Sequence, residues 1–310
     1  MNFFPTSVTA HGGLGFSLIL AALIWGGSFT ATKAALATLD PVLVAFSRLV
    51  IAMPFLLLLW RRFGPIRYRR GDWKLLLSMA LFEPFFYFIL EAHALRLTSS
   101  AAAATIIALL PPAVALTAYL VLREQVARRL WAGLFIALAG TLLLIWSGQA
   151  TPLAPNPLLG NLLEGFAMLT AVGYTLLVKQ LSARYSALFL TATQTFLGAI
   201  LLLPLAWNST VGQLQTASWQ TWLLLLYLGT VVSIGAYFLY NRALSKLPAS
   251  QVVIYTSLIP AFAALFDWLF LGEALNWLQN SAVVLVAAGV IYSQRPEPER
   301  TATLGFERLP

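Results

Sequence analysis

Ten apolar runs, separated by short polar breaks, make up almost the whole chain. None shows the strict alternation of apolar and polar residues that is typical of a membrane-spanning barrel strand, and each is close to the roughly 20 residues that a helix needs to cross the hydrocarbon core. The pattern therefore predicts an all-α integral membrane protein with ten transmembrane helices. Their expected positions are 14–36, 42–60, 73–95, 99–122, 130–146, 158–178, 187–207, 219–240, 249–271 and 277–293.

Landmark residues of the first half recur in the second half in the same order. The matching pairs, each 149 residues apart, are Ala94 with Ala243, Leu95 with Leu244, Pro111 with Pro260, Glu124 with Glu273 and Gly140 with Gly289. Two weaker matches, Gly27 with Gly173 and Lys33 with Lys179, occur at an offset of 146 residues. Self-similarity at a constant spacing indicates an internal duplication.

Lys and Arg gather in alternate breaks between the apolar runs. The breaks after the second, fourth, sixth and eighth runs and the C-terminal tail carry nearly all of the cations, whereas the remaining breaks contain only Arg96. Because positively charged loops stay inside the cell, we expect these breaks and both termini to be cytoplasmic.

The uncharged, proline-containing stretch GQATPLAPNP at 148–157 is expected to be an external linker between the halves. Five helices precede it and five follow, and because five is odd, the halves must enter the membrane in opposite orientations. The expected organisation is an N-terminal segment at 1–13, a first five-helix repeat at 14–147, a second at 158–293 and a cytoplasmic tail at 294–310. Inverted repeats with a binding site near the midplane are a recurring plan of transporters.

Composition supports a membrane protein and argues against several other classes. The chain of 310 residues is 60% hydrophobic and 10% charged, while soluble domains carry about 25% charged residues. Its net charge of +8 does not indicate nucleic-acid binding, because the cations lie in short breaks instead of one exposed basic domain. With no cysteine and two histidines, we expect no disulfide, no metal site and no cofactor. No ATP-binding motif is present.

Acidic and aromatic residues within the apolar runs are the candidates for a binding site. An acidic residue at mid-membrane costs about 2.5–3.5 kcal/mol on insertion scales, so it normally faces a cavity or a partner. Glu83, Tyr87 and Glu91 recur at four-residue steps and share one face of the third helix. The alternative for Glu91 is a structural ion pair with Arg48 or Lys33, which lie at similar depth.

Further polar residues could complete the same cavity. The predicted substrate-binding set is Glu83, Tyr87, Glu164, Tyr174, Tyr237, Tyr240, Trp25 and Arg48. The carboxylates and tyrosines would meet a substrate ammonium or side chain, and Arg48 would meet a carboxylate. For any single hydroxyl or amide, a hydrogen bond between helices is the competing interpretation. Pro111 and Pro260, at equivalent points of the fourth and ninth helices, are predicted hinges for alternating access.

The sequence resembles the EamA-type members of the drug/metabolite transporter superfamily. The motifs are Trp25-Gly26-Gly27-Ser28-Phe29 with Lys33, Ser47-Arg48, and the Pro111, Glu124 and Gly140 block with its echo in the second half. One departure is Arg123, where the second half has Gly272. The resemblance implies ten helices in an inverted repeat, a bacterial inner-membrane location and efflux of small molecules. The narrower hypothesis is the YddG-like branch, which exports aromatic amino acids and related metabolites.

Two other functions are weighed against amino-acid export. A transporter of drugs or nucleotide sugars would have the same fold, although the several intramembrane acids do not favour a phosphate-bearing substrate. An intramembrane enzyme would need a nucleophile and a base, for which Ser28 and His93 are the only candidates, with no third orienting group. We therefore expect a non-enzymatic transporter whose partners are a small-molecule substrate and the lipid bilayer.

Overall fold

The computed structural model describes residues 8–122, 128–147, 150–207, 212–272 and 275–293, and every regular element within those ranges is a helix. The α-helices are α1 (Val8–Ala35), α2 (Pro41–Leu58), α3 (Asp72–Ala80), α4 (Tyr87–Leu97), α5 (Ser100–Ile107), α6 (Leu110–Leu122), α7 (Arg128–Ser147), α8 (Pro157–Leu181), α9 (Ala187–Trp207), α10 (Gly212–Gln215), α11 (Trp219–Leu226), α12 (Tyr237–Leu244), α13 (Ala249–Val253), α14 (Ile259–Phe266) and α15 (Trp277–Ser293). The 3₁₀ and π segments are η1 (Trp60–Arg62), η2 (Leu81–Phe86), η3 (Tyr227–Ala236), η4 (Ile254–Leu258) and η5 (Asp267–Leu271).

Within the described ranges, eight helical stretches are long and apolar enough to cross a membrane. Two shorter apolar stretches, Trp131–Leu144 within α7 and Trp277–Tyr292 within α15, occupy the positions of the fifth and tenth predicted helices. The all-α membrane architecture is confirmed, while the count of ten spans and the orientation of the termini stay predictions. The loop residues Arg123, Glu124 and Glu273, part of the linker and the tail at 294–310 lie outside the described residues.

Helix starts follow the local sequence. The carboxylate of Asp40 accepts from Val42 N ahead of Pro41, and the side chain of Asn156 accepts from Leu159 N ahead of Pro157. In both cases a capping side chain satisfies a backbone N–H, and proline occupies a first-turn position where it has no hydrogen bond to lose.

Several predicted helices are interrupted in the middle. The third consists of α3, η2 and α4, and the eighth consists of α11, η3 and α12, so a π segment occurs near the same point of each repeat. In η2 the interruption includes Pro84, which has no N–H to donate to the helix ladder. These interruptions place polar side chains at the middle of the bundle.

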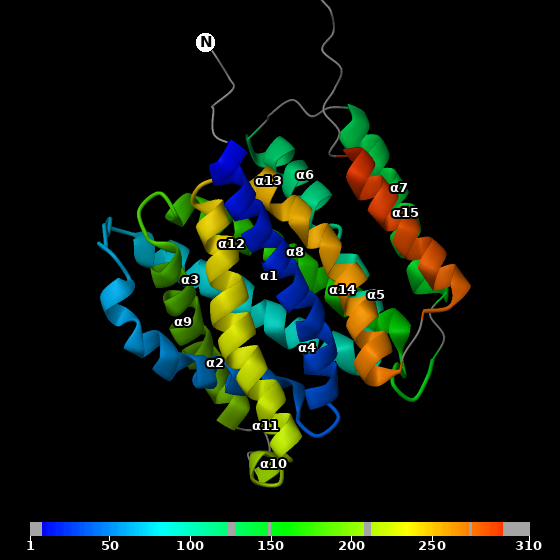
Figure 1. Ribbon diagram of the computed structural model, residues 1–310, viewed down its shortest axis with the longest axis horizontal. Coiled ribbons are helices and arrows are strands. Elements are labelled where there is room, and N and C mark those ends of the chain that lie inside the picture. Colours follow the sequence, from blue (N-terminus) through cyan, green and yellow to red (C-terminus); the bar gives the residue numbers. More distant parts are fainter. Residues whose placement is uncertain (1–7, 123–127, 148–149, 208–211, 273–274, 294–310) are drawn as a thin grey trace, which may run out of the picture.

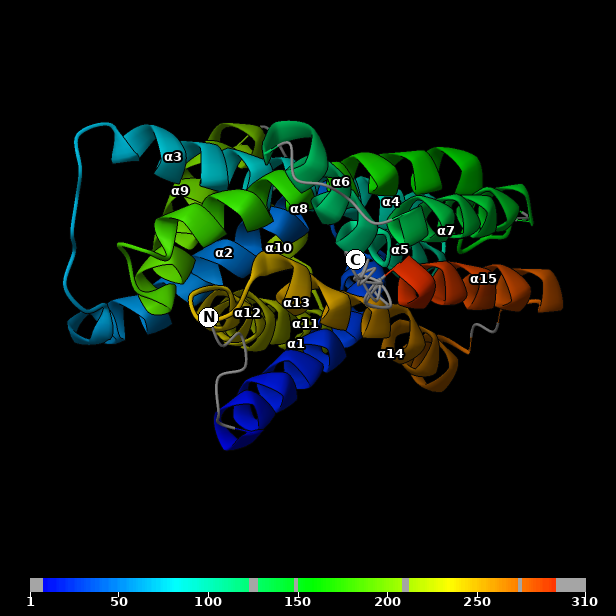
Figure 2. The ribbon, with the colours of Figure 1, turned by 90° about the horizontal axis from the view of Figure 1, so that it is seen from above.

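Helices α7 and α15 lie side by side at one end of the molecule, with α2, α3 and α9 at the other end (Figures 1 and 2). Their close approach depends on the duplicated glycines. A Cβ atom at Gly140 would lie 2.8 Å from Val286 N, and one at Gly289 would lie 2.4 Å from Ala137 N. The symmetric pair therefore permits backbone contact between the last helices of the two repeats.

Each of the duplicated lysines donates hydrogen bonds to carbonyl oxygens at the end of a neighbouring helix. Lys33 Nζ donates to Leu95 O at 3.3 Å and Thr98 O at 2.7 Å, beside the end of α4. Lys179 Nζ donates to the carbonyls of Leu244 and Leu247, both at 2.8 Å, beside the end of α12. Each acceptor of the second pair lies 149 residues after its counterpart in the first. The two repeats thus share a cap on the last carbonyls of an interrupted helix.

Candidate functional site

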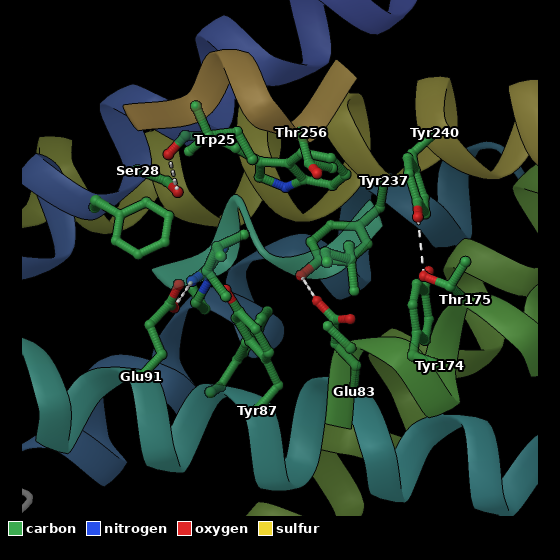
Figure 3. A pocket seen from close by; sticks show the side chains of 17 residues that line it. Trp25, Ser28, Glu83, Tyr87, Glu91, Tyr174, Thr175, Tyr237, Tyr240 and Thr256 are labelled. Atoms are coloured by element: carbon green, nitrogen blue, oxygen red, sulfur yellow. Dashed lines mark hydrogen bonds and ion pairs between the residues drawn. The ribbon is translucent and has the colours of Figure 1, made fainter. Parts of the chain in front are cut away.

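A central cavity lies where the two halves meet, and seven of the eight predicted substrate-binding residues line it (Figure 3). The first half contributes Trp25, Arg48, Glu83 and Tyr87, and the second contributes Tyr174, Tyr237 and Tyr240. Other lining residues are Ser28, Phe29, Phe88, Glu91, Ile107, Leu110, Ala171, Thr175, Thr256 and Ile259. Their placement brings together the charged and aromatic positions, but it does not test whether they bind a substrate.

The cavity is contracted in this conformation. The space available to a water-sized molecule is about 40 Å³, enough for a few waters, whereas pockets for small ligands occupy about 300–1,000 Å³. A molecule the size of an amino acid therefore needs the walls to separate before it can enter.

Glu83 reaches the cavity from the interrupted third helix. Its backbone is non-helical, with φ −150° and ψ 122°, and its peptide bond to Pro84 is cis. Tyr237 donates its hydroxyl to Glu83 Oε1, and the two side chains point toward one another across the cavity (Figure 3). Trp25 packs edge-on against Tyr237 and Tyr240, with ring centroids 5.6 Å and 5.1 Å apart. One carboxyl oxygen is thus held beside an aromatic wall.

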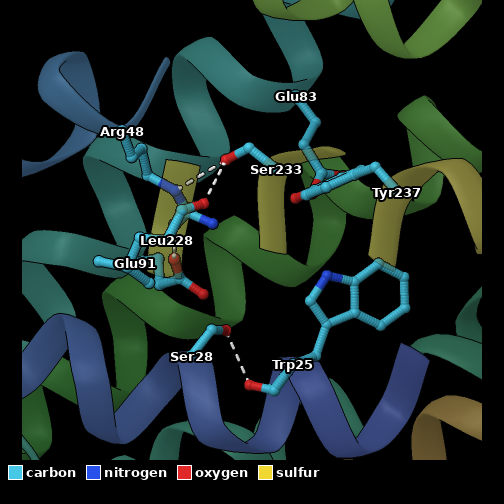
Figure 4. Close-up of polar contacts among 8 residues, drawn as sticks. All are labelled: Trp25, Ser28, Arg48, Glu83, Glu91, Leu228, Ser233 and Tyr237. Carbon is cyan, nitrogen blue, oxygen red and sulfur yellow. Dashed lines mark hydrogen bonds and ion pairs between the residues drawn. The ribbon is translucent and has the colours of Figure 1, made fainter. Parts of the chain in front are cut away.

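Arg48 is the cation of the cavity, and three side chains contact it, of which Glu91 and Ser233 are drawn in Figure 4. Its Nη1 lies 3.8 Å from Glu91 Oε2, and its Nε donates to Ser233 Oγ at 3.2 Å. Ser233 donates onward to Leu228 O at 2.8 Å, a carbonyl of π segment η3. The ring centroid of Phe88 lies 4.0 Å from Arg48 Cζ, which adds a cation–π contact. Of the two cations that the sequence left open as partners of Glu91, Arg48 is the one that forms the ion pair. Phe88, which the sequence did not single out, lies one turn before Glu91 on the same helix.

The second half supplies neutral hydrogen bonds where the first half has an ion pair. The hydroxyl of Tyr174 lies 2.7 Å from Gln194 Oε1 and 2.9 Å from Asn241 Oδ1, and Asn241 Nδ2 donates to Thr191 Oγ1 at 3.1 Å. Gln194 follows Arg48 by the 146 residues that relate α1 to α8. At this pair of equivalent positions the duplicated framework therefore carries different chemistry, a charged guanidinium in the first half and a neutral amide in the second.

Glu164 is the predicted site residue that does not line the cavity. It is fully buried in α8, and neither carboxyl oxygen has a hydrogen-bond partner among the described residues. Asp267 is also buried away from the cavity, where it accepts from Thr30 Oγ1 at 2.7 Å and Ala101 N at 2.9 Å. The position of Glu164 and Asp267 within apolar runs indicates that both are buried. It does not indicate whether either side chain lines the central cavity.

The contacts of Ser28 and His93 do not favour an enzyme. Ser28 Oγ donates to Trp25 O at 2.7 Å, and His93 Nδ1 lies 2.8 Å from Ile89 O, so each is bonded within its own helix. Over the ranges that the structure covers, no three His, Asp or Glu side chains are grouped to hold a metal. The polar groups of the cavity are instead arranged as paired charges and hydrogen-bond donors.

The predicted hinge prolines lie at helix interruptions in both halves. Pro111 is in the first turn of α6, after the break that follows α5, and Pro260 is in the first turn of α14, after the 3₁₀ segment η4. Leu110 and Ile259, their immediate predecessors, line the cavity. A bend at either proline would therefore move a wall of the cavity.

Comparison with known proteins relates both halves to one family. The model of the EamA-like transporter family matches twice, at residues 14–146 and 158–293. An uncharacterized transporter of Archaeoglobus fulgidus is 32% identical over 278 residues, covering 88% of this chain and 94% of that protein. A pseudopaline exporter of Pseudomonas aeruginosa is 26% identical, covering 89% and 94% of the two chains. An S-adenosylmethionine/S-adenosylhomocysteine transporter of Chlamydia trachomatis is 28% identical, covering 84% and 82%.

Proposed function

Because this chain belongs to the EamA-like transporter family and is a multi-pass membrane transporter, we propose that it exports amino acids with aromatic or other hydrophobic side chains, and related small metabolites. The observation that carries the proposal is the grouping of opposite charges and aromatic rings in one cavity. Glu83 supplies a carboxyl group and Arg48 a cation, and Trp25, Tyr237 and Tyr240 supply an apolar wall.

A zwitterion with an apolar side chain matches this arrangement. Its ammonium would lie against Glu83 and the tyrosine rings, and its carboxylate would lie against Arg48, displacing part of the contact with Glu91. The 3.8 Å separation between Arg48 Nη1 and Glu91 Oε2 is longer than a hydrogen bond, so a substrate carboxylate at hydrogen-bond distance would compete for the guanidinium. The aromatic wall would receive the side chain.

Alternating access would expose the cavity to either side of the membrane. The cavity of about 40 Å³ is too small for an amino acid, and Pro111 and Pro260 would allow α6 and α14 to bend and enlarge it. The inverted repeat would let one half open outward by the same motion that lets the other open inward, with both termini in the cytoplasm.

Transport of a larger amino-acid derivative is the second candidate. S-adenosylmethionine, named for the relative in Chlamydia trachomatis, combines an α-amino acid with a nucleoside. The same Glu83 and Arg48 would hold its amino-acid end, while the rings would stack on the base. The mainly apolar and aromatic remainder of the cavity favours an apolar side chain over the polar ribose.

The test is uptake by the purified protein reconstituted into liposomes. We expect uptake of labelled phenylalanine or tryptophan above that of protein-free liposomes, with competition by unlabelled aromatic amino acids and little by serine. Repeating the assay with an imposed pH gradient determines whether protons are coupled. Uptake of labelled S-adenosylmethionine without uptake of any amino acid would favour the second candidate, and uptake of neither by folded protein would reject both.

A further inference from the structure

A separate groove of about 670 Å³ lies at the end of the molecule where Lys and Arg gather. It is bounded by the end of α2, the connection between α8 and α9, and α12 with the turn that follows. It shares no lining residue with the central cavity, and the proposed function assigns it no role. We expect this end to face the cytoplasm.

The groove is apolar along part of its length and cationic at one end. On the α12 side, Ile234 and Phe238 are followed after one further turn by Arg242, and all three line the groove. On the α2 side, Leu59 is followed by Arg62. Because an α-helix rises about 1.5 Å per residue, Arg242 lies about 6 Å along the axis of α12 from Phe238. Both walls thus contain apolar residues and a cation that follows them in sequence.

The charge at the polar end is not neutralised by nearby acids. Across the described part of the chain, no carboxylate lies within 4.0 Å of the cationic groups of Arg62, Arg242 or Lys246. Asp72, the acid beside this region, is held by Arg184, whose Nη2 and Nε donate to its oxygens at 2.7 Å and 3.1 Å. The polar end of the groove therefore has a net positive charge.

Of two further features of the groove, the first leaves its charge unchanged and the second favours an anion. Tyr185 lines the groove and donates its hydroxyl to Asp72 Oδ2 at 2.7 Å. Burial, together with this hydrogen bond, raises the pKa of Tyr185 to about 12, so the ring stays neutral and adds no negative charge. The first residues of α9, Ala187 and Leu188, also line the groove, and the N-terminus of that long helix carries a partial positive charge.

We propose that this groove binds an anionic phospholipid of the cytoplasmic leaflet. The phosphate lies among Arg62, Arg242 and Lys246, and an acyl chain lies along Ile234 and Phe238. A free anion would use the cationic end alone, whereas a lipid uses both zones of the groove, which is why the continuous apolar wall favours the lipid. Anionic lipid then stabilises the contact between α2, α9 and α12 from outside the transport path.

Native mass spectrometry of the full-length protein in a neutral detergent tests the proposal. Phosphatidylglycerol and phosphatidylcholine with the same acyl chains are titrated separately, and tight binding of phosphatidylglycerol is expected. The double variant Arg242→Gln/Lys246→Gln should bind it about 30-fold more weakly, since each cation near an anionic headgroup contributes about a factor of five. Arg242→Lys, which keeps the charge, should retain most of the binding.

The matched control removes two cations from the same end of the molecule without touching the groove. Arg67 and Arg70 are exposed, precede α3 and do not line the groove, so Arg67→Gln/Arg70→Gln should leave binding within twofold. Equal loss in both double variants, or equal affinity for the two lipids, would reject a specific site. If millimolar inorganic phosphate competes for the groove as strongly as lipid does, the ligand is a free anion and the proposal is overturned. None of these outcomes depends on the transported substrate.

Discussion

Removing the charge of Glu91 tests the buried ion pair of the cavity most directly. Glu91 Oε2 lies 3.8 Å from Arg48 Nη1, and the two side chains are only 6% and 3% exposed. At that separation the attraction is about 4 kcal/mol with an effective dielectric constant of about 20. Glu91→Gln keeps the shape of the side chain but leaves the guanidinium without this counter-charge. We expect the free energy of unfolding to fall by about 3–5 kcal/mol, as for other broken buried pairs.

The exposed pair between Arg96 and Asp40 provides a matched control. Arg96 Nη1 lies 4.0 Å from Asp40 Oδ2, and these side chains are 53% and 37% exposed. Asp40→Asn removes that charge while keeping an oxygen that can accept from Val42 N at the start of α2. We expect a loss of less than about 1 kcal/mol, because solvent screens an exposed pair.

Equilibrium unfolding in mixed micelles, with an increasing fraction of denaturing detergent and far-ultraviolet circular dichroism as the readout, measures both losses. The double variant Arg48→Gln/Glu91→Gln should be more stable than Glu91→Gln alone, because it leaves neither charge buried without its partner. If Glu91→Gln costs no more than Asp40→Asn, or if the double variant is less stable than the single one, the buried pair does not have the energetic role inferred from its geometry.

Three further predictions concern transport and packing. Glu83→Gln should reduce amino-acid flux more than tenfold with an unchanged amount of protein in the membrane, since it removes a charge-assisted contact with the substrate; unchanged flux in the liposome assay would exclude Glu83 from the site. Pro111→Ala and Pro260→Ala should each slow exchange of labelled substrate, and rates equal to the unmodified protein would reject the hinges. Gly289→Val should lower stability by about 1–3 kcal/mol, because its Cβ would lie 2.4 Å from a backbone nitrogen of α7; Gly165→Val, whose Cβ meets nothing within 4 Å, is the control for the same unfolding measurement.

The sequence predicted best those features of the structure that depend on the local spacing of residues along the chain. The apolar runs predicted the helices, and the constant offset predicted pairs such as Gly140 with Gly289, whose shared packing role the structure explains. Spacing of four residues also placed Tyr87 and Glu91 on one face of α4, and both line the cavity. Glu83 lines it too, but from the non-helical backbone of η2, where helix spacing does not apply. These features could be predicted because helix periodicity determines which side chains of one helix share a face.

Partners on different helices could not be predicted in the same way. Sequence left Glu91 with two possible cations, and the structure pairs it with Arg48, while Lys33 donates to carbonyls at the end of α4. Glu164, like Glu83, is an acidic residue within an apolar run, yet it does not line the cavity. The rotation of each helix about its axis depends on packing against neighbours far away in sequence, and no local pattern records it.

The sequence by itself determined that this protein is a helical membrane protein made of two related halves, because crossing a bilayer demands long apolar helices and duplication leaves its landmarks in register. Only the tertiary structure decided that Glu83 meets Tyr237, that Arg48 meets Glu91 and Ser233, and that cations of η1 and α12 border one groove. The physical reason is that a helix can form from its own backbone hydrogen bonds, whereas a site between helices exists only after packing has set their separation, rotation and depth.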